Sequence, residues 1–245
     1  MPSTTTTPAE PASRARALLA TAGRLVLTWV VLVAVVLGVG WLLTHTLASS
    51  VGGWDDDVSR GIADERTPGL GEVADVGTLL ADTPVGMAVA ALSALAFAAW
   101  RRTWRPLVFV ALVVAGTGGI YAVGTHLISR DRPPVRILDP GLVPDHSFPS
   151  GHVGTAVTAY GALALLALAY SAAARPWALA ILLVPVLVLA ARLYQGAHHV
   201  TDVVTSVGYA GAWLLVVGRA VLPAPVGRTA VAGATDPSLG AGRHV

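Results

Sequence analysis

The stretch Leu25–Leu47, LVLTWVVLVAVVLGVGWLLTHTL, decides the fold because it contains no Asp, Glu, Lys or Arg over its whole length. A helix needs about 20 apolar residues to cross a hydrocarbon layer of roughly 30 Å. The stretch is too long for the apolar core of a signal peptide, and Thr46-Leu47-Ala48 is a weak cleavage site. We therefore interpret it as a membrane-spanning helix, with a cleaved signal as the alternative.

Five further apolar blocks have a similar length. They occupy residues 84–100, 106–126, 153–173, 177–194 and 201–221. The whole chain is 54% apolar and only 12% charged, whereas a soluble domain has about 25% charged residues. These features predict an all-α, polytopic membrane protein that folds as a bundle of six transmembrane helices. Pro185 lies inside the fifth block and is expected to kink it, because proline breaks the helical hydrogen-bond ladder.

The segments outside the apolar blocks divide the rest of the chain. Residues 1–24 and 223–245 are predicted to be disordered cytoplasmic tails on either side of a single domain, 25–222. Residues 49–82 mix charged and apolar positions, which favours short amphipathic helices lying at the interface in the first outer loop. We interpret the run Asp55–Asp57 in that loop as a solvated face, with a metal site as the alternative.

Arginine placement predicts the topology. Arginines precede the first block, separate the second from the third and the fourth from the fifth, and follow the last: Arg14, Arg16, Arg24, Arg101, Arg102, Arg105, Arg175, Arg219, Arg228 and Arg243. Six crossings put all these regions on one side, and positive charge stays in the cytoplasm. Both termini are therefore expected inside, and the segments 49–82, 127–152 and 192–200 outside.

Charge and cysteine content exclude some classes of protein. The formal charge is only +2 and no long basic run is present, so nothing favours nucleic-acid binding. The chain contains no cysteine, which excludes thiolate metal sites and cysteine nucleophiles.

A few arginines fall on the predicted outer side, where few acidic residues accompany them. They are Arg130, Arg132, Arg136 and Arg192. Because topology disfavours arginine on that side, we expect these side chains to have an anionic partner. Arg132 and Arg192 offer planar donor forks that match phosphate oxygens. Ser150 and Gly151 lie at a predicted helix start, where unpaired backbone N–H groups and the helix dipole also favour an anion. Together these residues predict a phosphate-binding site.

Two histidines and one aspartate could perform chemistry at that site. His198 and Asp202 are four residues apart, so on a helix they would share one face. A carboxylate that accepts a hydrogen bond from one imidazole nitrogen makes the other nitrogen a better nucleophile. His152 comes from a different helix and could protonate the leaving oxygen. We expect phosphoester hydrolysis through a phosphohistidine, without a metal.

These residues form motifs that resemble the type 2 phosphatidic acid phosphatase superfamily. Its three motifs are Lys-x6-Arg-Pro, Pro-Ser-Gly-His and Ser-Arg-x5-His-x3-Asp. Arg132-Pro133 is similar to the end of the first motif, and Pro149-Ser150-Gly151-His152 to the whole second motif. Arg192, His198 and Asp202 have the spacing of the third. The resemblance covers roughly residues 84–222 and points to the membrane branch of the superfamily.

The resemblance implies roles for the individual residues. It implies that His198 is the nucleophile, that Asp202 activates it and that His152 is the proton donor. It also implies that phosphate is bound by the remaining motif residues Arg132, Ser150, Gly151 and Arg192.

The chain departs from the family motifs at two positions. Thr125 stands where the family has Lys, and Ala191 stands where it has Ser. We expect His126 or Arg130 to compensate for the missing Lys, so these two and Thr125 are candidate substrate contacts.

The expected function is that of a plasma-membrane lipid phosphatase with its active site on the extracytoplasmic side. By resemblance, the candidate substrates are undecaprenyl diphosphate, phosphatidic acid and phosphatidylglycerol phosphate, and no cofactor or metal is required. The bilayer and the lipid phosphate are then its only expected partners. One alternative is a phosphotransferase that uses the same intermediate. Another is a non-catalytic protein that binds lipid phosphate.

Overall fold

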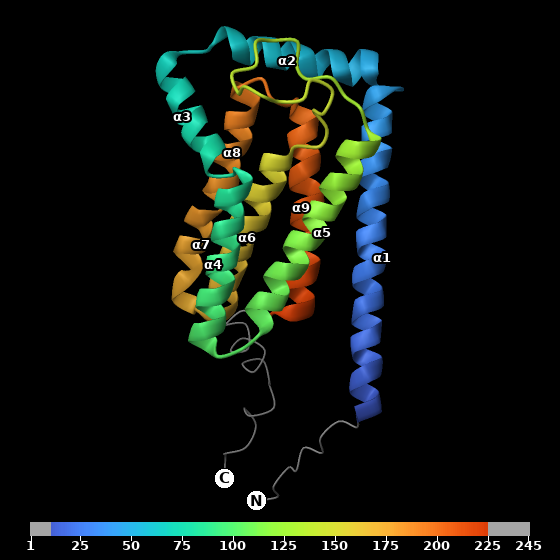
Figure 1. Cartoon of the computed structure of the whole chain (residues 1–245), viewed down its shortest axis with the longest axis vertical. Coiled ribbons are helices and arrows are strands. Elements are labelled where there is room, and N and C mark those ends of the chain that lie inside the picture. The colour runs from blue at the N-terminus through green and yellow to red at the C-terminus, as the bar shows by residue number, and fades with distance from the viewer. Residues whose placement is uncertain (1–10, 225–245) are drawn as a thin grey trace, which may run out of the picture.

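The computed structural model describes residues 11–224, and this part of the chain is helical apart from its loops (Figure 1). The helices are α1 (Pro11–Thr44), α2 (Gly53–Asp64), α3 (Pro68–Leu79), α4 (Thr83–Arg101), α5 (Arg105–Leu127), α6 (Gly151–Tyr170), α7 (Arg175–Ile181), α8 (Leu183–Tyr194) and α9 (Val200–Val221). A π-helical turn, Ala48–Gly52, and a 3-10 turn, Ala172–Ala174, complete the regular structure of these residues. The predicted tails at 1–10 and 225–245 lie outside the described residues.

The described residues contain six helical segments long and apolar enough to cross a membrane. Five of them are α1, α4, α5, α6 and α9, and the sixth runs through α7 and α8 from Ala172 to Tyr194. The predicted six-span, all-α bundle is therefore confirmed. The fifth span is also interrupted as predicted: it divides at Leu182, between the end of α7 and the start of α8. Pro185 follows three residues later, has no N–H and crowds the carbonyl of the preceding turn.

Helix α1 begins earlier than predicted. The sequence analysis placed a disordered tail up to residue 24, but the described part of that tail is already helical from Pro11. Residues 11–22 contain Ala, Leu and Arg, which are strong helix formers, and no glycine. The expectation of disorder is wrong for the described part of this segment, because good helix formers need no buried face to extend an existing helix.

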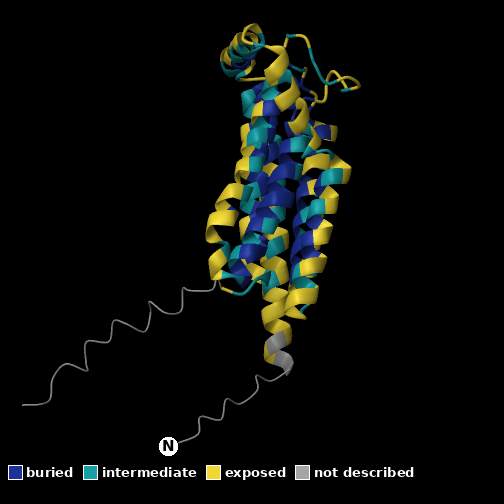
Figure 2. Cartoon of the chain, turned by 90° about the vertical axis from the view of Figure 1, so that its left-hand side faces the viewer, coloured by how far each residue is buried: buried dark blue, intermediate teal, exposed yellow. Residues whose placement is uncertain are grey.

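Helix α6 occupies the centre of the bundle and is the most buried of the candidate spans (Figure 2). It packs against α4, α5, α8 and α9, while α1 packs on the outside against α5 and α9. The core face of α6 is rich in small residues, including Gly154, Ala156, Ala159 and Gly161. Small side chains let neighbouring helices approach closely within a membrane, where packing rather than water exclusion holds helices together.

Gly116 of α5 shows how close this packing is. A Cβ atom at Gly116 would lie 2.1 Å from Nε1 of Trp213 on α9, and that indole donates a hydrogen bond to the carbonyl of Leu112 at 3.0 Å. We expect Gly116→Ala to force α5 and α9 apart and to destabilise the fold by about 1–3 kcal/mol. The measurement is the thermal unfolding midpoint in detergent. Gly118→Ala is the matched control, because no atom lies within 4 Å of its Cβ position; an equal midpoint for both variants would contradict this packing.

Helices α2 and α3 form the predicted short helices of the first loop. Helix α2 lies across one end of the bundle, and α3 runs back along α8 (Figure 1). Thr67 caps α3 by accepting a hydrogen bond from the N–H of Leu70, and Pro68 occupies its first turn. The interpretation of Asp55–Asp57 as a solvated face is wrong for Asp55, whose side chain is fully buried. It is confirmed for Asp57, which is exposed and pairs with Arg60 at 2.9 Å.

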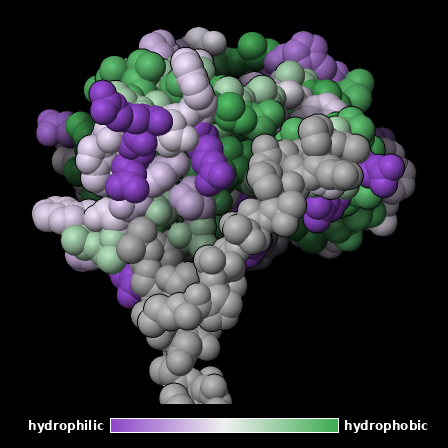
Figure 3. Space-filling view, turned by 90° about the horizontal axis from the view of Figure 1, so that it is seen from below, coloured by the Kyte–Doolittle hydropathy of each residue, from purple (hydrophilic) through white to green (hydrophobic). Residues whose placement is uncertain are grey.

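The opposite end of the bundle carries several arginines. Arg101 and Arg105 flank the short connection between α4 and α5, Arg175 begins α7, and Arg219 lies in the last turn of α9. Figure 3 looks onto this end and shows strongly hydrophilic residues among hydrophobic ones. The distribution of charge between the two ends therefore matches the arginine pattern of the sequence.

Candidate active site

The motif residues gather at the α2 end of the bundle. Three segments contribute: the loop 128–150 that joins α5 to α6, the first turn of α6, and the turn 195–199 that joins α8 to α9. The first and third segments are tied together, because the N–H of Leu138 donates to the carbonyl of Gln195 at 2.9 Å. Arg130 and His146 also form an isolated β-bridge within the loop.

His198 is buried and held by one backbone contact. Its Nδ1 lies 2.6 Å from the carbonyl oxygen of Ser147. A carbonyl oxygen only accepts hydrogen bonds, so Nδ1 carries the proton and Nε2 carries the lone pair. This tautomer is the one that a nitrogen nucleophile requires. The carbonyl of Ser147 thus has the orienting role that the sequence analysis gave to a carboxylate.

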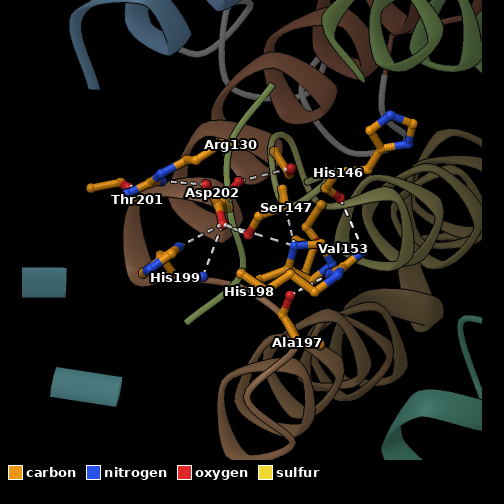
Figure 4. Close-up of polar contacts among 12 residues, drawn as sticks. Arg130, His146, Ser147, Val153, Ala197, His198, His199, Thr201 and Asp202 are labelled. Atoms are coloured by element: carbon orange, nitrogen blue, oxygen red, sulfur yellow. Dashed lines mark hydrogen bonds and ion pairs between the residues drawn. The ribbon is translucent and has the colours of Figure 1, made fainter. Parts of the chain in front are cut away.

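The expected hydrogen bond from His198 to Asp202 is wrong. The Nδ1 of His198 lies 3.9 Å from Oδ2 of Asp202, which is beyond hydrogen-bonding distance. The reason is that α9 begins at Val200, so His198 precedes the helix and the i,i+4 rule does not apply to the pair. Asp202 instead accepts hydrogen bonds from the hydroxyl of Ser147 at 2.6 Å and from the N–H of His199 at 2.9 Å (Figure 4). Asp202 is therefore connected to His198 through the two hydrogen bonds that Ser147 makes.

Burial lowers the pKa of His198 to about 3 from its ordinary 6.5, and the charges of Arg192 and Arg132 lower it further against the opposing effect of Asp202. The imidazole is therefore neutral near pH 7, as a nucleophile must be. Between pH 6.5 and about 3, the unfolded chain binds a proton at this position and the folded protein does not. His198 therefore costs stability as the pH falls through that window.

We expect this cost to appear as a difference between two proteins. On going from about pH 7 to about pH 5, the thermal midpoint of the wild type should fall more than that of His198→Gln, which cannot take up the proton. Thermal unfolding in detergent at both pH values measures the difference. A parallel fall in both proteins would show that His198 is not held neutral.

Arg192 is the most completely buried of the site arginines. Its side chain is 0% exposed, and its Nη1 donates to Asp139 at 2.7 Å, to Gln195 at 3.0 Å and to Thr78 at 3.3 Å. Its Nε and Nη2 have no hydrogen-bond partner within residues 11–224. Buried N–H groups are nearly always paired, so this edge of the guanidinium calls for a ligand. An Nε–Nη2 edge is one of the two forks that bind two oxygens of a phosphate at once.

The first turn of α6 provides the second side of the site. Ser150 caps α6, and its hydroxyl accepts a hydrogen bond from the N–H of Val153. Gly151 has Tyr121 against it, since a Cβ at that position would lie 3.1 Å from the tyrosine ring. His152 follows, and its Nε2 lies 3.1 Å from Oδ1 of Asp82. Arg192 lies within electrostatic range of both His152 and His198.

Arg132 has a larger structural role than predicted. Its guanidinium donates to the carbonyls of Val143 at 2.8 Å, Ala197 at 2.5 Å and His146 at 3.0 Å. Among residues 11–224 these contacts use three of its five N–H groups, so at most two remain for a ligand. Burial lowers the pKa of Arg132, and the charge of Arg192 lowers it further. Arg132 therefore ties the α5–α6 loop to the turn 195–199 and contributes charge beside Arg192.

The candidates for replacing the missing family Lys are placed differently from expectation. Arg130 is buried and pairs with Asp55 at 2.8 Å and with Asp202, so its guanidinium is already engaged within the protein, and its contact with a substrate stays a prediction. His126 lies on the exposed side of α5, with Nδ1 bonded to the carbonyl of Ala122 at 2.7 Å. Thr125 is buried at the end of α5. Substrate contact by His126 or Thr125 stays a prediction.

Sequence reasoning missed several residues that hold the site. They are Asp55, Ser147, Asp82, Asp139 and Gln195. Only Asp82 had a usable signal, because it directly precedes Thr83-Pro84, a typical helix start. No group of three or more His, Asp or Glu side chains in the described chain could hold a metal ion.

The fold and the site together define a polytopic membrane protein with two histidines and a buried arginine at one end of its bundle. The PAP2 superfamily model matches residues 106–223. The structure is similar to the crystal structure of a transmembrane PAP2-type phosphatidylglycerolphosphate phosphatase from Bacillus subtilis, with a TM-score of 0.67 and 25% sequence identity over 78% of this chain and 94% of that chain. No curated protein matches the chain. The chain belongs to the type 2 phosphatidic acid phosphatase superfamily, in its membrane branch.

Proposed function

We propose that the protein hydrolyses a lipid phosphate or diphosphate through a phosphohistidine on Nε2 of His198. Family membership supports phosphoric ester hydrolysis in general. The observation that carries the mechanism is that the site combines two features. His198 is neutral, with its proton fixed on Nδ1 by the Ser147 carbonyl, and the Nε–Nη2 edge of Arg192 has no partner within residues 11–224. One group can attack phosphorus while the other binds the phosphoryl oxygens.

The reaction proceeds in two balanced steps. In the first, Nε2 of His198 attacks phosphorus, the bond from phosphorus to the leaving oxygen breaks, and His152 gives that oxygen its proton. In the second, water attacks the phosphohistidine, the nitrogen–phosphorus bond breaks, and the proton lost by water returns to His152. Arg192, Arg132 and the N–H groups at the start of α6 stabilise the charge on the transferring phosphoryl group.

A cavity beside His152 supports a lipid substrate. It has a volume of about 300 Å³ and lies between α4, α5 and α6, with His152 and Tyr121 among its lining residues. Small and apolar residues such as Gly86, Met87 and Val114 make up much of the remaining lining, together with several threonines and Tyr209. A hydrocarbon chain attached to a phosphate in the site could occupy this space while staying within the membrane-spanning part of the bundle.

Charge distribution supports an extracytoplasmic site. Arg101, Arg105, Arg175 and Arg219 lie at the end opposite α2, and the positive end of a membrane protein faces the cytoplasm. The proposed site then opens on the other side of a multi-pass plasma-membrane protein, with both termini in the cytoplasm. Lipids of the outer leaflet present their phosphates at that level.

The lipid-phosphate proposal is tested by phosphate release in detergent with a chelator present. The panel contains phosphatidic acid, phosphatidylglycerol phosphate, undecaprenyl diphosphate and the water-soluble p-nitrophenyl phosphate. We expect the wild type to prefer long-chain substrates. Gly118 lines the cavity and has open space at its Cβ position, so Gly118→Phe should lower long-chain turnover by about 10-fold or more relative to the soluble ester. Gly23→Phe, where a Cβ also meets open space on α1, is the control.

An unchanged ratio of long-chain to soluble turnover in Gly118→Phe would contradict the cavity's role. Failure of the wild type to release phosphate from any member of the panel would contradict the function.

A further inference from the structure

Asp55 of α2 is a buried carboxylate that neither the motifs nor the matched family region includes. It lies outside residues 106–223, and its side chain is 0% exposed. It accepts hydrogen bonds from Nη2 of Arg130 at 2.8 Å and from the hydroxyl and N–H of Thr201, at 2.5 and 3.3 Å. An ionised group costs several kcal/mol to bury unless it is well paired, so the position of Asp55 depends on these partners.

Asp55 is in contact with the start of the helix that follows the nucleophile. The cap of α9 is His199, so the N–H of Thr201 belongs to the first turn, where backbone N–H groups lack partners inside the helix. A carboxylate at a helix N-terminus also interacts favourably with the helix dipole. Asp55 therefore fixes the beginning of α9 from a different helix, across the top of the bundle.

Arg130 connects Asp55 to the nucleophile. Its guanidinium contacts Asp55 through Nη2 and Asp202 through Nη1, so one side chain bridges the two carboxylates. Asp202 accepts the hydroxyl of Ser147, and the carbonyl of Ser147 accepts Nδ1–H of His198. Figure 4 shows this row of contacts, from Arg130 through Asp202 and Ser147 to His198.

The second carboxylate decides the orientation of Arg130. Asp202 alone could pair with the guanidinium in more than one arrangement. Asp55 holds the other nitrogen, and Thr201 accepts from Nη1 at 2.7 Å, so the plane of the guanidinium is fixed by three contacts. Without Asp55, Nη2 of Arg130 would be buried and unpaired, and the side chain would gain by turning away from Asp202.

We propose that Asp55 is a positioning residue that sets the orientation of His198 through Arg130, Asp202 and Ser147. The proposal rests on the phosphohistidine mechanism. It assigns a part of the site to the first loop, which the matched family region does not cover.

The test compares Asp55→Asn with Asp57→Asn. The two carboxylates lie two residues apart on α2, but Asp57 is exposed and forms an ion pair with Arg60, which is itself half exposed. For the purified full chain, kcat and KM are measured with a lipid phosphate that the wild type hydrolyses. Inhibition by vanadate and by inorganic phosphate is measured alongside. Vanadate bonds to a correctly placed Nε2 as a transition-state mimic, whereas phosphate needs only the arginines and the start of α6.

Asp55→Asn is expected to lower kcat by about 10- to 100-fold, with an equal weakening of vanadate inhibition. KM and inhibition by phosphate should change by less than about 2-fold, because the phosphate-binding groups are untouched. Thr201→Val removes the hydroxyl's contacts with Asp55 and Arg130 but leaves the ion pair between them, so it should show the same pattern with a smaller loss. Asp57→Asn should match the wild type.

Two results would overturn the proposal. One is a kcat for Asp55→Asn within about 2-fold of the wild type. The other is a loss of kcat in both Asp55→Asn and Thr201→Val that is matched by an equal loss of phosphate binding and a lower thermal midpoint, because that pattern indicates general structural damage. A wild type without activity would instead defeat the proposed function, so the two failures are distinguishable.

Discussion

Phosphate release is expected to fall by at least about 10,000-fold when His198 is replaced with Ala, because the attacking nitrogen is lost and nothing nearby can replace it. The neighbouring His199 cannot substitute, since its Nε2 is bonded to Asp56 at 3.0 Å and it caps α9. Substrate binding should persist, because Arg192 and the start of α6 are unchanged. The measurements are phosphate release and binding of lipid phosphate by the inactive variant.

The control for this variant is His146→Ala. His146 is exposed on the same end of the bundle, and its imidazole lies 4.0 Å from the carboxylate of Asp145. Its replacement should leave activity within about 2-fold of the wild type. Turnover by His198→Ala above one-hundredth of the wild-type rate would contradict a histidine nucleophile at this position.

Arg192→Lys is expected to lower kcat/KM by about 100- to 1000-fold, although it keeps the positive charge. A lysine has one terminal nitrogen in place of the planar fork, so it cannot bind two phosphoryl oxygens along the Nε–Nη2 edge. Its single ammonium group would also have to replace the hydrogen bonds that Arg192 donates to Asp139, Gln195 and Thr78. Steady-state kinetics with vanadate inhibition measures the loss, which should appear in both kcat and vanadate affinity.

Arg60→Lys is the matched control for the arginine. Arg60 lies at the same end of the bundle, is half exposed and pairs with Asp57 at 2.9 Å. A surface ion pair of this kind contributes about 1 kcal/mol or less, so the control should be as active as the wild type. If Arg192→Lys were as active as Arg60→Lys, the positive charge alone would explain the role of Arg192, and the planar fork would not be needed.

The membrane fold could be predicted from the sequence because one physical rule governs it. A helix that crosses the bilayer must be apolar over about 20 residues, and six stretches of the chain meet that condition in the described residues. The kink at Leu182 follows from Pro185 for an equally local reason. The start of α1 was misplaced because disorder was inferred from composition over a segment whose residues favour helix.

The site was predictable only in part, because side-chain partners depend on tertiary contacts. The motif spacing identifies His152, His198 and Arg192 as members of the candidate site. The absence of a hydrogen bond between His198 and Asp202 does not follow from that spacing, because predicting it requires knowing that α9 begins at Val200. Asp55 could not be identified from its surroundings in the chain, where two further aspartates follow it. Only the position of α2 across the end of the bundle shows which of the three is buried.

The most direct test of the mechanism is to identify the phosphorylated atom. The wild type is mixed with a ³²P-labelled lipid phosphate and quenched in base, where phosphohistidine survives and acyl phosphates do not, and the labelled peptide is mapped. We predict label on His198, on Nε2, because Nδ1 is bonded to the Ser147 carbonyl. Label on Nδ1 or on another residue, or product formed with no labelled enzyme during a single turnover, would contradict it.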